Sequence, residues 1–151
     1  MLKENKAHLT AITRKTLSKP MQYLVEQDLI KGNALDYGCG KGFDCDALGI
    51  SGYDPFHRQT MSLDMTPDRV FNTIACNYVL NVIPDEQERK DVIEQIKTLL
   101  TDDGIAYISV RNDVKELNGW TKRDTWQGHI LLDLPIVKKT SNFIMYKVTK
   151  N

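Results

Sequence analysis

The sequence predicts one α/β domain with a mostly parallel sheet and helices on both faces. Candidate strands and helices alternate along most of the chain, which is typical of this class. The first candidate strand ends in a run of glycines, as expected where a strand turns into a helix. The 151 residues, 41% of them apolar, suit a single domain over residues 1–151. Within it we expect an N-terminal helical extension over residues 1–31 and a core over residues 32–151.

The elements of the first half follow from apolar spacing and from turn residues. Ser18 and Pro20 predict the start of a helix over residues 19–30, which Gly32 ends. The expected elements that follow are a buried strand over 33–37, a short helix over 43–48 and a second strand over 49–53.

In the second half, residues 56–69 contain no convincing helix and at most a brief edge strand at 61–63. Residues 71–79 are an apolar run of strand length, which indicates a central strand buried on both faces. Asp85, with Glu88 three residues later, predicts a helix start. The apolar face of this helix is formed by Val92, Ile93, Ile96, Leu99 and Leu100. We expect the helix to end at Gly104.

The last expected elements are three strands. One covers residues 105–110, and segments 130–132 and 143–148 are expected to pair as an antiparallel hairpin.

Composition excludes several classes of protein. No window approaches 18 apolar residues and the first ten residues carry several charges, so we expect no membrane span and no secretory signal. Cys39, Cys45 and Cys76 are an odd number of cysteines without the spacing of a zinc site. We therefore expect a reduced, cytoplasmic protein without a metal.

The glycine run Gly38, Gly40 and Gly42 follows Asp36, between the first strand and the first core helix. Such a loop lets a ligand approach the backbone closely, and the following helix offers free N–H groups. A phosphate-binding P-loop would need serine or threonine after Lys41, where Gly42 stands. The dinucleotide fingerprint would need a third glycine where Phe43 stands, so dinucleotide binding is weakened but stays an alternative.

Residues 34–44 resemble the first motif of the class I S-adenosylmethionine (SAM) dependent methyltransferases. The resemblance implies a minimal Rossmann-like fold, in which the glycine loop lies under the amino-acid part of SAM. It implies that Asp36 orders the loop and the ammonium of the ligand, and that Asp54, at the end of the second strand, binds both ribose hydroxyls. A carboxylate suits a vicinal diol because it accepts two charge-assisted hydrogen bonds. The cofactor-binding residues so implied are Asp36, Gly38, Cys39, Gly40, Gly42, Asp54, Pro55, Asp64, Met65 and Asn77.

The resemblance continues downstream. It implies that Asp64 bonds the adenine amino group, that Met65 packs on the adenine ring, and that Asn77 faces the methionine moiety. Asn77 and Tyr78 are the candidate catalytic residues, but they lack the two prolines typical of adenine amino-group methyltransferases, which disfavours an ordinary DNA adenine methyltransferase. The helix usually found between the second and third strands is nearly absent. Segments 10–14, 17–20, 36–42 and 53–55 are most similar to small bacterial and phage methyltransferases, including ones associated with DNA phosphorothioation.

The predicted function is transfer of a methyl group from SAM to an unidentified acceptor, with S-adenosylhomocysteine (SAH) as product. A SAM-binding module without transfer activity, such as a sensor or an inactive partner subunit, is the alternative. His57 and His129 are possible bases, although a lone histidine is more often structural.

The acceptor is expected to be a small molecule or a nucleic acid. Residues 1–31 carry a net charge of +3, residues 32–110 of −7 and residues 111–151 of +4. Such a division can steer an anionic acceptor toward the basic ends. The expected contacts are Arg14, Lys15, Lys19, Arg111, Lys122 and Arg123, with Trp120 or Trp126 as a stacking surface.

Overall fold

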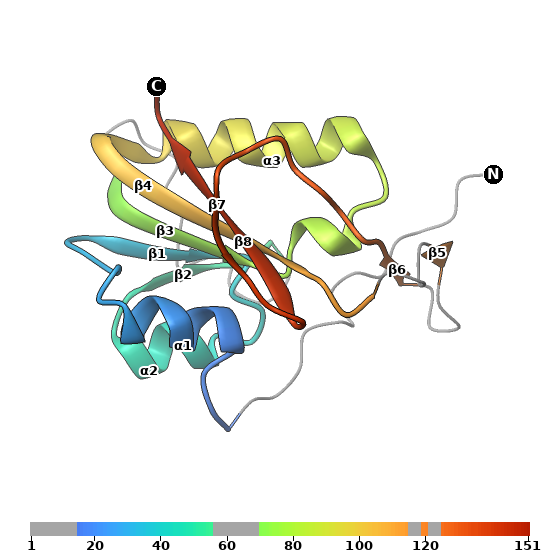
Figure 1. Cartoon of the computed structure of the whole chain (residues 1–151). Coiled ribbons are helices and arrows are strands. Elements are labelled where there is room, and N and C mark those ends of the chain that lie inside the picture. Colours follow the sequence, from blue (N-terminus) through green and yellow to red (C-terminus); the bar gives the residue numbers. More distant parts are fainter. Residues whose placement is uncertain (1–14, 56–69, 115–118, 121–124) are drawn as a thin grey trace.

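A six-stranded sheet forms the centre of the protein, seen here in a computed structural model (Figure 1). The structure describes residues 15–55, 70–114, 119–120 and 125–151. The strands of the sheet are β1 (Ala34–Tyr37), β2 (Ser51–Tyr53), β3 (Phe71–Asn77), β4 (Leu100–Arg111), β7 (Ile136–Lys139) and β8 (Phe143–Thr149). The helices are α1 (Lys19–Glu26), α2 (Phe43–Leu48), α3 (Glu86–Thr98) and the 3-10 turn η2 (Leu80–Val82).

The strands lie in the order β2-β1-β3-β4-β8-β7. The first four are parallel, and β8 runs antiparallel to both β4 and β7. The mostly parallel sheet with a C-terminal antiparallel hairpin is therefore confirmed. After β1 the chain first adds β2 on one side and then β3 on the other, so the strand order reverses at β1. Ligands of such sheets bind at this switch point, outside the carboxyl ends of the strands.

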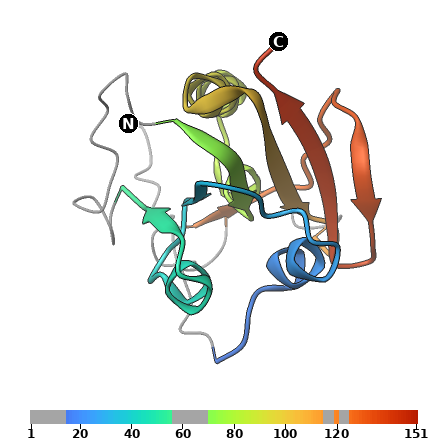
Figure 2. The same ribbon diagram turned by 90° about the vertical axis from the view of Figure 1, so that its left-hand side faces the viewer.

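Helices cover both faces of the sheet, with α3 on one side and α1 and α2 on the other (Figures 1 and 2). Successive strand residues point to opposite faces. Along β3, Ile74 packs in the cluster that contains Ile96 of α3, which we call the α3-side core. Ala75 packs in the cluster that contains Met21 and Leu24 of α1, which we call the α1-side core. Both faces of the central strand are thus buried, as its apolar run predicts.

Several predicted boundaries are wrong. Helix α1 ends at Glu26 rather than at residue 30. Helix α3 ends at Thr98, and β4 begins at Leu100, so that Gly104 lies inside a strand rather than after a helix. Leu99 and Leu100 extend the apolar pattern of the helix because they are buried in the same cluster as Ile96. The central strand ends at Asn77, because Tyr78 has a φ of 63° and leaves the extended conformation.

The predicted strand at 130–132 is also wrong, because β8 pairs with β7 instead. Ile130 is buried against the α3-side core without joining the sheet, and the backbone N–H of Leu132 donates to the hydroxyl of Tyr146 at 3.2 Å. Strand β7 is mostly exposed and carries Lys138 and Lys139, a composition typical of edge strands. Its sequence therefore lacks the apolar signal that segment 130–132 has.

A small antiparallel hairpin joins β5 (Gly119–Trp120) to β6 (Trp126–Gln127), and the sequence does not predict it. The expected edge strand at 61–63 lies outside the described residues.

The start of α3 offers a test of local stability. The carboxylate of Asp85 accepts a hydrogen bond from the backbone N–H of Gln87 at 2.9 Å, so Asp85 is the N-cap, as predicted. Asp85→Ala should lower the free energy of unfolding by about 1 kcal/mol, since an N–H of the first turn loses its partner. Urea unfolding measures this, with Asp102→Ala at an exposed position as the control for the lost charge. Equal stabilities of the two variants would contradict the capping role.

Candidate functional site

The glycine loop lies between β1 and α2, at the carboxyl end of β1. Gly38, Gly40 and Gly42 have φ angles of 81°, 58° and 91°, which residues other than glycine rarely adopt. The backbone N–H groups of Gly38 and Cys39 donate to the carbonyl of Tyr53 at 2.7 and 2.8 Å. The loop is thereby fixed to the end of β2.

Gly38 also brings the loop close to the segment that follows β3. A Cβ atom at Gly38 would lie 2.3 Å from Cγ2 of Val79. The glycine is therefore required both by its φ angle and by its packing, and it holds the ends of β1 and β3 together.

Asp54 follows β2 and contacts the same loop. One of its carboxylate oxygens accepts a hydrogen bond from the backbone N–H of Gly40 at 3.1 Å. The neighbouring Pro55 is exposed, and Asp36, inside β1, is buried with 4% of its surface exposed. The structure thus brings Asp54 to the predicted loop, whereas Asp64 and Met65 lie outside the described residues.

Asn77 and Tyr78 lie at the carboxyl end of β3. The backbone N–H of Tyr78 donates to the carbonyl of Ser109 in β4 at 2.8 Å, with Tyr78 in a left-handed conformation (φ 63°). Such a conformation is uncommon for a bulky residue and is found most often at functional sites. The Tyr78 side chain packs against the α1-side core.

Cys39 is a neutral thiol in this loop. Burial, with the nearby Cys45, Asp36 and Asp54, raises the pKa of Cys39 far above its usual value. Gly52 lies beneath it, because a Cβ there would be 2.4 Å from Sγ of Cys45 and 3.1 Å from Sγ of Cys39. The thiol therefore fills space and is a poor nucleophile.

This raised pKa predicts a pH dependence. A thiol reacts with iodoacetamide as the thiolate, and the rate for an ordinary thiol with a pKa of about 8.5 levels off by about pH 10, so the alkylation rate of Cys39 should still be rising above that pH. Mass spectrometry of the modified peptide gives the rate at each pH, and the urea-unfolded chain is the control. A rate that levels off by about pH 10 in the folded protein, as in the unfolded chain, would contradict the raised pKa.

Two polar contacts near the glycine loop could not be predicted from the sequence. The backbone N–H and the hydroxyl of Ser18 donate to the two carboxylate oxygens of Asp44, at 3.1 and 2.6 Å, and both residues are buried. Ser18 begins α1 as predicted, yet its side chain makes no capping bond because it binds the first turn of α2 instead. The start of α1 is thus tied to the helix that follows the glycine loop.

The segment after β4 is fixed by two buried asparagines. Asn81 donates through Nδ2 to Gln127 at 3.0 Å. Asn112 donates through Nδ2 to the carbonyl of Thr140 at 2.6 Å, so its Oδ1 accepts from Nε2 of His129 at 2.9 Å. His129 is therefore a structurally fixed residue, and His57 lies outside the described residues.

The residues expected to contact an acceptor differ in their surroundings. Arg111 forms two hydrogen bonds with Asp113, at 2.9 and 3.1 Å, and this pairing lowers the pKa of Asp113. Lys15 and Lys19 are exposed, and Trp120 is 40% exposed. Trp126 packs against the α3-side core. Arg14, Lys122 and Arg123 lie outside the described residues.

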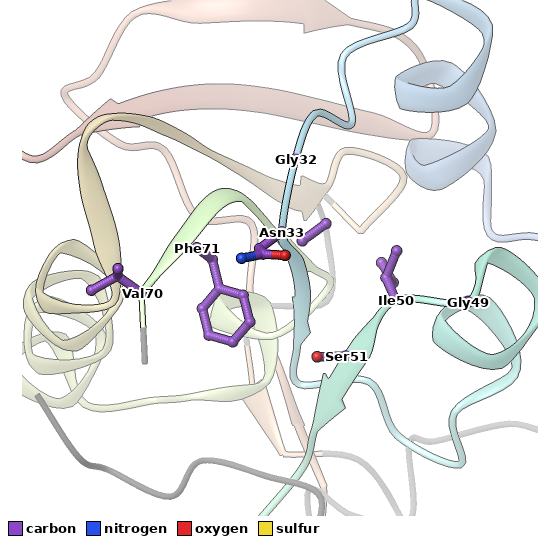
Figure 3. Close-up of a pocket in the computed structure, with 8 residues that line it drawn as sticks. Gly32, Asn33, Gly49, Ile50, Ser51, Val70 and Phe71 are labelled. Carbon is purple, nitrogen blue, oxygen red and sulfur yellow. The ribbon is translucent and has the colours of Figure 1, made fainter. Parts of the chain in front are cut away.

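A cavity of about 380 Å³ lies at the amino ends of the parallel strands, opposite the end that carries the glycine loop. Its walls are the amino ends of β1, β2 and β3, with Asn33, Ser51 and Phe71 among the lining residues (Figure 3). It is separate from the glycine loop, and we do not assign the cofactor to it because ligands of this fold bind at the carboxyl ends of the strands.

Within residues 15–55, 70–114, 119–120 and 125–151, neither a metal site nor a membrane-spanning helix is present. No group of three or more histidine, cysteine, aspartate or glutamate side chains there could hold a metal ion. No helix in that part of the chain has the length and apolar character needed to cross a membrane.

Comparison with known proteins matches this geometry to one family. A methyltransferase domain model matches residues 9–133. The TehB-like SAM-dependent methyltransferase of Corynebacterium glutamicum has a TM-score of 0.54 at 18% identity, over 87% of each chain. The N-methyltransferase NodS of Bradyrhizobium japonicum, solved with SAH, has a TM-score of 0.54 at 13% identity, over 85% of this chain and 84% of NodS.

Other matches are partial. The chain spans 22% of PKMT2 from Rickettsia typhi and 52% of CcbJ from Streptomyces caelestis, with TM-scores of 0.40 and 0.46. No curated protein matches the sequence significantly. The domain model covers most of the chain, and structures of matching size share its Rossmann-like fold. The chain therefore belongs to the methyltransferase domain family that this model describes, and it shares the fold of SAM-dependent methyltransferases.

Proposed function

We propose that this protein transfers a methyl group from SAM to an acceptor and releases SAH. The observation that carries the proposal is the glycine loop, which presents three residues of positive φ at the switch point of the sheet and is hydrogen-bonded to Asp54. A backbone without side chains at this point leaves room for a ligand to lie against it.

The residues present fit SAM. Asp36 and the glycine loop would hold its amino-acid part, Asp54 its ribose hydroxyls, and Asn77 the methionine moiety. Cys39 and Pro55 would border the ligand. Asp64 and Met65 are proposed for the adenine from the family resemblance alone.

SAM, when bound, supplies a methyl carbon on a positively charged sulfur. The acceptor's lone pair forms the new bond to this carbon, the carbon–sulfur pair stays on sulfur, and an N–H or O–H acceptor loses its proton to water or to a base. Positive charge disappears in this displacement, so the main task of the protein is alignment. Asn77 and Tyr78 are proposed for that task because they lie beside the glycine loop, at the end of β3.

The acceptor is proposed to be a small molecule or a nucleic acid, and the protein a member of the small bacterial or phage type. The exposed Lys15 and Lys19 support an anionic acceptor such as a nucleic acid. The pairing of Arg111 with Asp113 weakens this case, because it neutralises one of the expected contacts. Binding to DNA and RNA in the presence of SAH, measured from low to moderate salt, separates the two. A nucleic-acid site must lose affinity steeply as salt rises.

Turnover tests the proposal. The purified protein should convert methyl-labelled SAM to SAH when a fractionated cell extract supplies acceptors, and the label should appear in one fraction. Tight SAM binding without SAH formation in any fraction would instead favour a SAM-binding module.

A further inference from the structure

Three buried polar atoms lie without a partner at the carboxyl ends of β3 and β4. In the part of the chain that the structure describes, Oγ of Ser109 and both Oδ1 and Nδ2 of Asn77 make no hydrogen bond. Ser109 is fully buried. Buried polar atoms in native proteins are almost always bonded, so such atoms call for an explanation.

The two residues are neighbours in the sheet. Asn77 and Ser109 are register partners of a parallel pair, and therefore point to the same face. It is the face that α1 covers, because Ala75 and Tyr107, the register partners two residues earlier, both pack in the α1-side core. Their polar atoms therefore lie on the same face of neighbouring strands, at the strand ends where the glycine loop also lies.

Other buried polar side chains in the described ranges are satisfied. The hydroxyl of Thr73, on the same strand and the same face, binds the backbone of Lys31 twice, at 2.8 and 2.9 Å. Asn81 and Asn112, near the same edge, are bonded as well. Among the described residues, the buried side-chain atoms without a hydrogen-bond partner therefore belong to Asn77 and Ser109.

We propose that Asn77, whose amide would lie between the methionine moiety and the acceptor, binds the nucleophilic group of the methyl acceptor together with Ser109, and that this group is an uncharged nitrogen or oxygen that carries a hydrogen. This inference rests on the proposed function and adds the class of acceptor. Ser109 is its specificity-determining residue, which the family resemblance did not suggest.

The chemistry of the pair sets this class. The amide of Asn77 offers two donors and an acceptor, and the hydroxyl of Ser109 offers one of each. A neutral amine, amide or hydroxyl can satisfy both kinds of atom, whereas a carboxylate or phosphate has no hydrogen to donate. Asp36, buried on the adjacent strand opposite Ala75, points to the same face and further disfavours an anion.

Small fragments test this proposal without knowledge of the true acceptor. Formamide and methanol, added to the SAH-saturated protein and to the free protein, should shift the side-chain amide resonances of Asn77 in ¹⁵N NMR spectra, and acetate should not. Ser109→Ala should reduce the formamide shift by about fivefold or more while changing the SAM dissociation constant by less than about twofold. Unmoved Asn77 resonances, or an equal response to acetate, would overturn the proposal.

Thermal unfolding separates this role from a structural one. Ser109→Ala should leave the melting temperature of the free protein unchanged or raise it, because no bond is lost, whereas the control Thr73→Val should lower it. A drop for Ser109→Ala as large as that for Thr73→Val would also overturn the proposal. A loss of SAM affinity above about tenfold in Ser109→Ala would assign the pair to the cofactor instead. Absence of SAM binding in the wild type would contradict the proposed function, and the fragment titration of the free protein would still decide the role of the pair.

Discussion

Gly40→Val should reduce SAM affinity by at least about 100-fold, which corresponds to about 2.8 kcal/mol. Gly40 has a φ of 58°, a conformation that a β-branched residue strongly resists, and its N–H donates to Asp54. The new side chain would also occupy space that the proposed function gives to the ligand. Isothermal titration calorimetry with SAM measures the affinity, and circular dichroism checks that the variant is folded.

Gly49→Val is the matched control for backbone strain. Gly49 follows α2 with a φ of 67°, and a Cβ there would meet nothing within 4 Å. This variant should lose stability through the same strain but bind SAM with nearly native affinity. If both variants lost affinity equally, or if Gly40→Val bound normally, the loop would have no direct role in binding.

Asp54→Ala should weaken SAM binding by about 2 to 4 kcal/mol, since two charge-assisted hydrogen bonds to the ribose are lost. The structure adds a second reason, because the same carboxylate accepts from the N–H of Gly40 at 3.1 Å. Removal of the side chain therefore also releases the loop.

Asp54→Asn separates these two contributions. The amide oxygen can still accept from Gly40, so this variant should hold the loop and lose only the charge, giving an intermediate affinity. Asp46→Asn, at an exposed position in α2, controls for the change in net charge. Native affinity in a folded Asp54→Ala protein would remove Asp54 from the site.

The sheet and the glycine loop could be predicted because their signals are local. The apolar runs of β1 and β3, and three glycines after Asp36, need no knowledge of distant residues. The pairing of β8 could not be predicted, because segment 130–132 is apolar for packing on the core, whereas β7 is an exposed edge strand rich in lysine.

The candidate site was predicted as far as the family motif extends. The structure brings Asp54 into contact with Gly40 of the loop, and the binding of SAM by both residues stays a prediction. The bonds between Ser18 and Asp44 join positions 26 residues apart, and nothing local marks them. Ser109 was missed for a similar reason, because a serine in a strand attracts notice only when its hydroxyl is known to be buried and without a partner.

A titration of the wild-type protein with SAH tests the central claim, that the carboxyl ends of β1 and β2 form a SAM site, most directly. We expect saturable binding with one SAH per chain, displaced by SAM and unaffected by NAD at the same concentration. Absence of binding at millimolar SAH, or displacement of bound SAH by NAD, would contradict the account.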